Sequence, residues 1–155
     1  MIPTTLAEHD RAGYASALEQ ARRGAAEGGI PIGSSIFERG TQLGAGCNRR
    51  VQDGDPTAHG EIDALRNAGR RASYATTTLY STLAPCALCS GAVIQFGIPR
   101  VVVGEDASFP GELDLLRSRG VEVVVLDDPE TTDMMARFIA EEPTLWNEDI
   151  GIDET

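Results

Sequence analysis

The stretch "TTLYSTLAPCALCSGAVIQFGIPRVVVGE", residues 77–105, contains the alternation that decides the fold. Its beginning, "TTLYST", is typical of a short strand, and the continuous valines of "RVVVGE" indicate a second strand that is buried. Between them Pro85 opens a helix, "CALCSGAVIQFG", which Gly97 and Pro99 close. A strand, a helix and a further strand in this order predict a sheet that carries helices on its faces.

The flanking sequence continues this alternation. The segments "IPIGSSIFE" and "TQLGAGCN" lie on either side of Arg39-Gly40 and predict a hairpin, and "VEVVVLD" near the C-terminus predicts another buried strand. We predict further helices over residues 8–28, from Thr57 or Ala58 to Arg70, over 111–120 and over 128–142, the last capped by Asp128 and Pro129. The last two strands are separated by a helix and should therefore run parallel. These elements predict an α/β fold.

The composition limits the class of protein. The 155 residues, of which 41% are hydrophobic, suit one domain with a real core, so we predict a single domain over 1–155. The net charge of −11 argues against a nucleic-acid partner, because phosphate contacts need clustered cations. Every basic side chain is arginine, which excludes Schiff-base catalysis by lysine.

Membrane and secretory functions find no support in the sequence. No apolar run is long enough to cross a bilayer, and the N-terminal residues lack a basic region followed by an apolar block. We therefore predict a cytoplasmic protein with no membrane partner. Its substrate can still be a small neutral molecule, because the acidic charge balance does not bear on such a ligand.

The cysteines indicate metal or redox chemistry. Cys47, Cys86 and Cys89 are too few, and odd in number, for a disulfide framework. Cys86 and Cys89 form a C-x-x-C pair that shares one face at the start of a helix. Cys47 ends a strand, which favours a buried apolar thiol over a reactive one.

The second motif is "TAHGEID", residues 57–63, where one of the two histidines stands two positions before a glutamate. His59, Cys86 and Cys89 would supply one imidazole and two thiolates to a zinc ion, and the fourth position would remain for water, as in catalytic sites. Glu61 then lies where it can move a proton from that water. H-x-E with P-C-x-x-C is typical of zinc nucleobase deaminases.

Two other interpretations compete with this one. A thioredoxin-like redox pair would use Cys86 and Cys89 but leaves His59 and Glu61 without a role. A structural zinc site in a binding module would need a fourth protein ligand. His9, before the first helix, is the only other histidine and is expected at the surface.

With these motifs in place, the chain resembles the cytidine-deaminase superfamily, and within it the yeast-type cytosine deaminases, from about Gly28 to Gly151. The segments "GGIPIG", "HGEIDAL", "RGVEVVVLDD" and "WNEDIG" carry the resemblance together with residues 78–105. It implies a three-layer α/β/α sandwich with a central five-stranded mixed sheet, one zinc per chain and a homodimer. Because Trp146 and Asp149 follow the last predicted helix, we also expect a C-terminal lid segment over 143–155.

The resemblance also implies the substrate contacts for a free nucleobase. Asn48 and the backbone N–H of Gly60 would bind the 2-oxo group of cytosine, Asp149 would accept from ring N1–H, and the carbonyl of Ala84 would accept from the amino group. Phe109, Trp146 and Ile32 would wall the pocket, and Val51 and Thr57 complete the predicted set. The implied reaction is hydrolysis of cytosine to uracil and ammonia.

The specificity stays open at this point. Where the yeast-type enzymes have a bulky phenylalanine, this chain has Val51, and we expect a wider entrance that admits related amino-pyrimidines and amino-triazines. Guanine deamination on the same scaffold is the alternative, and tRNA adenosine deamination is disfavoured by the acidic, lysine-free composition. A zinc-binding module without catalysis is the non-enzymatic alternative.

Overall fold

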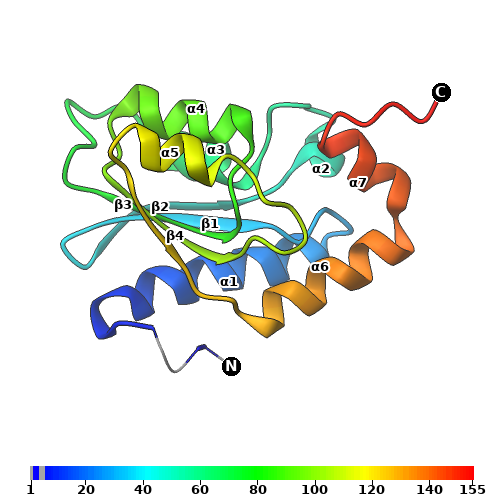
Figure 1. The fold of residues 1–155 in the computed structure, drawn as a ribbon, viewed down its shortest axis with the longest axis horizontal. Coiled ribbons are helices and arrows are strands. Elements are labelled where there is room, and N and C mark those ends of the chain that lie inside the picture. Colours follow the sequence, from blue (N-terminus) through cyan, green and yellow to red (C-terminus); the bar gives the residue numbers. More distant parts are fainter. Residues whose placement is uncertain (1, 4–5) are drawn as a thin grey trace.

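The computed structural model of the chain describes residues 2–3 and 6–155, and these contain a five-stranded sheet (Figure 1). The strands are β1 (Gly33–Glu38), β2 (Thr41–Cys47), β3 (Thr78–Leu83), β4 (Arg100–Glu105) and β5 (Glu122–Val125). They lie in the order β2-β1-β3-β4-β5. β1 is antiparallel to both of its neighbours, whereas β3, β4 and β5 run parallel. The sheet is mixed, and its last two strands are parallel, as predicted.

Helices cover both faces of this sheet. They are η1 (Glu8–Asp10), α1 (Arg11–Ala26), α2 (Arg50–Asp53), α3 (Gly60–Ala68), α4 (Ala87–Phe96), α5 (Leu113–Ser118), α6 (Pro129–Glu141) and α7 (Pro143–Asp149). α1 and α6 lie on one face, and α3, α4 and α5 lie on the other (Figure 1). The predicted three-layer α/β/α sandwich is therefore confirmed. Within the described residues, no helix combines the length and the apolar character that crossing a bilayer requires.

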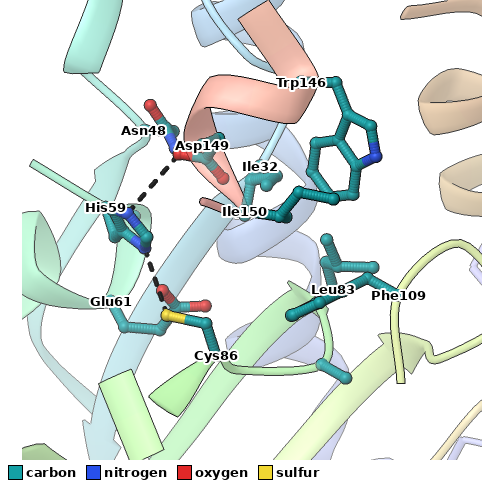
Figure 2. Close-up of a pocket in the computed structure, with 12 residues that line it drawn as sticks. Ile32, Asn48, His59, Glu61, Leu83, Cys86, Phe109, Trp146, Asp149 and Ile150 are labelled. Atoms are coloured by element: carbon teal, nitrogen blue, oxygen red, sulfur yellow. Dashed lines mark hydrogen bonds and ion pairs between the residues drawn. The ribbon is translucent and has the colours of Figure 1, made fainter. Parts of the chain in front are cut away.

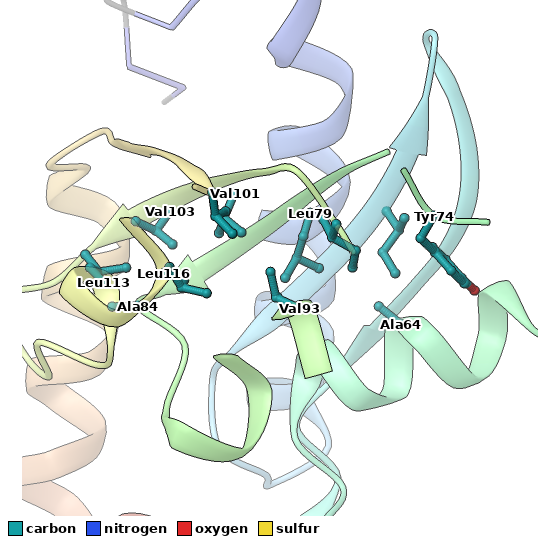
Figure 3. Packing of buried hydrophobic residues seen from close by; sticks show 12 residues of the cluster. Ala64, Tyr74, Leu79, Ala84, Val93, Val101, Val103, Leu113 and Leu116 are labelled. Atoms are coloured by element: carbon teal, nitrogen blue, oxygen red, sulfur yellow. The ribbon is translucent and has the colours of Figure 1, made fainter. Parts of the chain in front are cut away.

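The core follows the alternation of side chains along the central strands. Val101 and Val103 of β4 pack in the cluster beneath α4 and α5, where Figure 3 shows them near Leu116. Val102, between them, points to the opposite face and packs with Tyr14 of α1. Because both faces are covered, β4 is apolar at every central position, which explains the continuous valine run.

The helix ends follow the local sequence signals. The side chain of Asp128 accepts a hydrogen bond from the backbone N–H of Glu130, and Pro129 occupies the first turn of α6. Gly97 ends α4 in the left-handed conformation, with a φ of 69°, which glycine adopts without steric cost. The signals at Asp128, Pro129 and Gly97 therefore act as predicted, whereas Pro85 lies just before the N-cap of α4, Cys86.

Three features depart from the prediction. The helix expected from Thr57 or Ala58 begins only at Gly60, because Asp55 accepts hydrogen bonds from the backbone N–H and hydroxyl of Thr57 and holds it in a turn. The short helix α2 is not predicted. The C-terminal segment, predicted only as a lid, contains the helix α7 over Pro143–Asp149.

Candidate active site

The starts of α3 and α4 bring three metal-ligating side chains together. His59 is the N-cap of α3, Cys86 is the N-cap of α4, and Cys89 follows in the first turn of α4. One ligand atom from each residue lies within 4.8 Å of the other two. Nδ1 of His59 faces the cysteines, 3.4 Å from Sγ of Cys86. The structure therefore places the three predicted ligands at one point.

The donor set fits a zinc ion. Tetrahedral zinc with bonds of about 2.0 Å to nitrogen and about 2.3 Å to sulfur holds its ligand atoms roughly 3.5–4 Å apart, which these atoms can satisfy. Hydrogen bonding from Cys89 lowers the pKa of Cys86 to about 4 against the effect of burial, and His59 lowers it further. That same bond to Cys86, together with burial, raises the pKa of Cys89. A divalent cation favours both thiolates, because metal ligands bind deprotonated.

The far side of the imidazole is held by a carboxylate. Nε2 of His59 lies 3.4 Å from Oδ1 of Asp149, which is itself almost completely buried. Burial lowers the pKa of His59, but hydrogen bonding with Cys86 and the charge of Asp149 outweigh it and raise the pKa to about 9. A carboxylate behind the imidazole fixes the ring orientation, which is the usual support for a metal-bound histidine.

Glu61 lies beside the cysteines and is only 4% exposed. Its Oε1 accepts a hydrogen bond of 2.7 Å from the hydroxyl of Ser81, which in turn accepts one from Ser34. Burial raises the pKa of Glu61, and the negative charge of Cys86 adds to the effect. A buried carboxyl group with a raised pKa next to a metal site is suited to take up and release a proton.

These groups open onto one cavity, whose walls Figure 2 shows. The lining consists of Ile32, Asn48, His59, Gly60, Glu61, Leu83, Ala84, Cys86, Phe109, Trp146, Asp149 and Ile150. The rings of Phe109 and Trp146 meet edge to face, with centroids 6.0 Å apart and an interplanar angle of 87°. The cavity volume is about 20 Å³, which is room for roughly one water molecule. The cavity is therefore too small for a ring-sized ligand in this conformation.

One end of the cavity is polar, and its side chains are oriented by the protein. Oδ1 of Asn48 accepts a hydrogen bond of 3.0 Å from the backbone N–H of Arg50. The amide nitrogen of Asn48 donates to Oδ1 of Asp149 over 3.3 Å. The same Asp149 oxygen is 3.5 Å from Nε of Arg50. Within the described residues the side-chain hydrogen bond to this carboxylate falls on Oδ1, so Oδ2 can accept from a donor in the cavity.

Gly60 brings the backbone close to the cavity at the start of α3. A Cβ at this position would lie 3.2 Å from the carbonyl oxygen of Ile32 and 3.3 Å from the hydroxyl of Ser34. These contacts are tighter than most Cβ contacts in proteins, and one of them is with backbone. The absence of a side chain therefore lets the start of α3 pack closely against Ile32 and Ser34, beside the cavity.

The structure brings together most of the residues predicted for the site. Those lining the cavity are Ile32, Asn48, His59, Gly60, Glu61, Ala84, Cys86, Phe109, Trp146 and Asp149, with Cys89 beside them in the metal cluster. Val51 and Thr57 are not part of the lining. Val51 is 41% exposed on α2, and Thr57 is exposed in the turn before α3. Both face away because α2 and the Asp55 turn place their backbone outside the cavity.

Four residues near the site are absent from the sequence prediction. Leu83 and Ile150 line the cavity, Ser81 holds Glu61, and Arg50 contacts Asp149. Ser81 carries a weak sequence signal, because it is a polar residue that alternates with Leu79 and Leu83 along β3. Arg50 carries none, since surface arginines are frequent in this chain.

Comparisons with known proteins identify the family. The chain matches the family described as the cytidine and deoxycytidylate deaminase zinc-binding region over residues 7–105, and it belongs to this family. The structure agrees, because the family's zinc-binding character coincides with the grouping of His59, Cys86 and Cys89.

Individual relatives are more specific. The chain is 50% identical over 145 residues to the cytosine deaminase of Candida albicans. The aligned residues cover 92% of this chain and 97% of the relative. Among solved structures, the guanine deaminase from Nitrosomonas europaea superposes with a TM-score of 0.73 at 26% identity, covering 89% of this chain and 88% of its own. A protein in complex with 2,6-diaminopurine gives a TM-score of 0.75 at 27% identity, covering 90% and 86%.

Proposed function

We propose that the chain catalyses the zinc-dependent hydrolytic deamination of cytosine to uracil and ammonia. The observation that carries the proposal is one small cavity at which the metal-ligand group, the buried Glu61 and the Asn48–Asp149 pair meet. The 50% identity to a cytosine deaminase over nearly the full length of both chains supports the choice of base. Uracil is a free base of the kind that pyrimidine salvage reuses.

Recognition of the ring follows from the orientation of the polar groups. Because the oxygen of Asn48 is engaged by the backbone of Arg50, its amide nitrogen is the group available to donate to the 2-oxo oxygen. The N–H of Gly60 donates to the same oxygen. Oδ2 of Asp149 accepts from ring N1–H, which also excludes nucleosides, since their N1 carries a sugar and no proton.

The remaining contacts enclose a flat, neutral ring. The carbonyl oxygen of Ala84 accepts a hydrogen bond from the amino group of cytosine. Phe109, Trp146 and Ile32 pack against the ring and exclude water from it, as apolar walls do in small-molecule sites. Val51 and Thr57 lie outside the lining. They therefore influence specificity through the access of a substrate to the cavity.

The chemistry divides between the metal and Glu61. Zinc held by His59, Cys86 and Cys89 would supply a nucleophile near neutral pH, because it lowers the pKa of a bound water molecule. Glu61 accepts a proton from water and delivers it to ring N3, which makes C4 electrophilic. The oxygen of that water bonds to C4. Glu61 then takes the second proton of the water and passes it to the amino nitrogen as the C4–N bond breaks, so that cytosine and water give uracil and ammonia.

Access to the cavity requires movement of the C-terminal segment, residues 143–155, which we propose as a lid on an otherwise single catalytic domain. Trp146, Asp149 and Ile150 of this segment form part of the lining. A volume of about 20 Å³ does not admit a pyrimidine, since a site of about 10–15 Å³ holds a single water molecule. Opening of α7 is the movement that exposes the polar end of the cavity.

The chain is further proposed to act as a homodimer in the cytoplasm. Leu88 and Phe96 of α4 are 45% and 51% exposed. Phe96 also borders a groove of about 660 Å³ between α3 and α4 that Ile62, Leu65 and Tyr74 line. A second copy covering this face would bury these apolar side chains. The three cysteines are free, and free thiols persist in reducing compartments, which favours the cytoplasm.

A second candidate function, guanine deamination, is favoured by the structural likeness to a guanine deaminase. Ammonia release should be measured from cytosine, 5-substituted cytosines, isocytosine, amino-triazines, guanine and adenosine, with the zinc content determined alongside. Highest kcat/KM on cytosine supports the proposal, and highest kcat/KM on guanine replaces it. One zinc per chain, with no ammonia released from any of these compounds, would indicate a zinc-binding module. Turnover of cytosine with none of its analogues would exclude the broadened specificity.

A further inference from the structure

Arg50 is a charged residue that lies next to the polar end of the cavity and is largely buried. It begins the short helix α2 (Arg50–Asp53), two residues after Asn48. Only 11% of its side chain is exposed, although neighbouring residues of α2 are open to solvent. A guanidinium in such a position needs partners that replace water, because burying an unpaired charge is costly.

Two partners of this guanidinium lie on the C-terminal helix α7. Nη1 of Arg50 donates to Oε2 of Glu148 over 3.4 Å, and Nε lies 3.5 Å from Oδ1 of Asp149. Nε also donates to the carbonyl oxygen of Pro56 over 3.3 Å. Arg50 therefore joins two segments that are 98 residues apart in the chain.

The two ion pairs differ in their surroundings. Glu148 is 63% exposed, so its pair with Arg50 is screened by water and holds α7 only weakly. Asp149 is 6% exposed, and Oδ1 of its carboxylate contacts the side chains of Arg50, Asn48 and His59. Losing the guanidinium would remove one of the three groups that hold this carboxylate oxygen.

The contact of Arg50 with Glu148 lies at the surface, where α2 meets α7. A surface hollow of about 320 Å³ is lined by Arg50, Gly54, Asp55, Pro56 and Glu148. On the other side of this contact between α2 and α7, Asp149 faces the cavity, as Figure 2 shows. Separation of α2 from α7 at this point would open the cavity to that hollow.

We infer that Arg50 is a positioning residue, which clamps α7 over the cavity and holds the Asp149 carboxylate so that Oδ2 faces the substrate. The inference rests on the proposed function for the role of Asp149, whereas the clamp on α7 is independent of it. Arg50 acts through Asp149 and does not touch the reacting atoms. Its loss therefore weakens binding of the base and leaves the chemical step intact.

Two measurements on Arg50→Met test both parts of the inference. Methionine keeps most of the buried stem and removes the charge. The first measurement is amide hydrogen exchange over residues 143–150, and the second is steady-state kinetics on the base that the parent enzyme turns over best. Arg50→Lys is the conservative variant, because it keeps the charge but loses the forked geometry.

Arg49→Met is the matched control. Arg49 is the preceding residue and also forms ion pairs, but its partners are Asp53 of α2 and Glu27 beyond α1. The Arg49→Met substitution therefore removes the same charge from the same segment, but none of the ion pairs that it breaks involves α7. Thermal unfolding and zinc content of every variant show whether the fold and the metal site are preserved.

We expect Arg50→Met to speed exchange over 143–150 at least threefold and to raise KM at least tenfold, with kcat changed by less than threefold. Arg50→Lys should fall between the parent and Arg50→Met, and Arg49→Met should match the parent in both measurements. Unchanged exchange in Arg50→Met overturns the clamp, whatever the activity. Faster exchange with an unchanged KM, or an equal loss in Arg49→Met, overturns the positioning of Asp149. If the parent deaminates no base, the proposed function fails while exchange still decides the clamp.

Discussion

Glu61→Gln removes a single ionisable group from the cavity and keeps its shape. Glutamine is isosteric with glutamate, and its oxygen can keep the 2.7 Å hydrogen bond from Ser81. Glu61 does not belong to the His59, Cys86 and Cys89 group that is placed to hold the metal. The substitution should therefore leave metal binding and folding intact. Because a neutral amide avoids the cost of burying a charge, stability should be equal or higher.

The expected loss of turnover is large. A positioned general acid–base contributes about 10²–10⁴-fold to a rate, which corresponds to roughly 2.7–5.4 kcal/mol at about 1.36 kcal/mol for each factor of ten. Two proton transfers in the proposed reaction, to ring N3 and to the amino nitrogen, use the same carboxyl group. We therefore expect a loss of kcat toward the upper end of this range, about 10³-fold or more.

The assay compares kcat for ammonia release from cytosine in the parent and in Glu61→Gln, with zinc content and urea unfolding measured on the same samples. Glu19→Gln is the control, because it makes the same chemical change at an exposed position of α1. A kcat within tenfold of the parent, with zinc retained, would refute the role of Glu61 as proton carrier. Loss of zinc together with activity would also contradict it, because Glu61 would then be needed to hold the metal.

Three further predictions concern the fold and the lid. Burial raises the pKa of Asp10, but hydrogen bonds from Arg100 and Tyr80 outweigh it and leave the pKa below its usual value. Its stabilising effect is therefore complete above the unfolded-state pKa of about 3.9 and is lost as pH falls through the lowered folded-state pKa. In urea unfolding, Asp10→Asn should cost about 3 kcal/mol at pH 7, and the difference should shrink in acid; a constant difference would contradict this. Trp146→Ala removes a wall of the cavity and should raise KM for cytosine with zinc content unchanged, and an unaltered KM would exclude Trp146 from the site. Ending the chain after Glu142 should abolish binding of cytosine in calorimetry while zinc stays bound, and retained binding would exclude residues 143–155 as a lid.

The fold could be predicted because its signals are local. The continuous valines of residues 101–103 report burial on both faces of β4, and the start of α6 is encoded by Asp128 and Pro129. The start of α3 was predicted too early, since the turn formed by Asp55 competes with helix formation at Thr57. α2 is only four residues long and leaves no periodic pattern to detect.

In the candidate site, too, the residues with local signals could be predicted and those with distant partners could not. The metal ligands and Glu61 could be predicted because each motif sits within one helix start, where a few residues determine which way the side chains point. Ser81 and Arg50 could not, because their partners belong to other segments of the chain. The outward placement of Val51 likewise depends on how α2 packs, and its residue type does not reveal this.

By itself, the sequence determined the alternation of strands and helices, the three metal-binding side chains and the acid beside them. These properties depend on neighbours a few residues apart, and backbone geometry at such short range allows few alternatives. Only the tertiary structure decided that Asn48 donates directly to Asp149, 101 residues along the chain, and that Arg50 contacts the same carboxylate oxygen. Those contacts depend on how α7 packs back across the cavity, and hydrophobic packing between distant segments leaves no fixed spacing in the sequence.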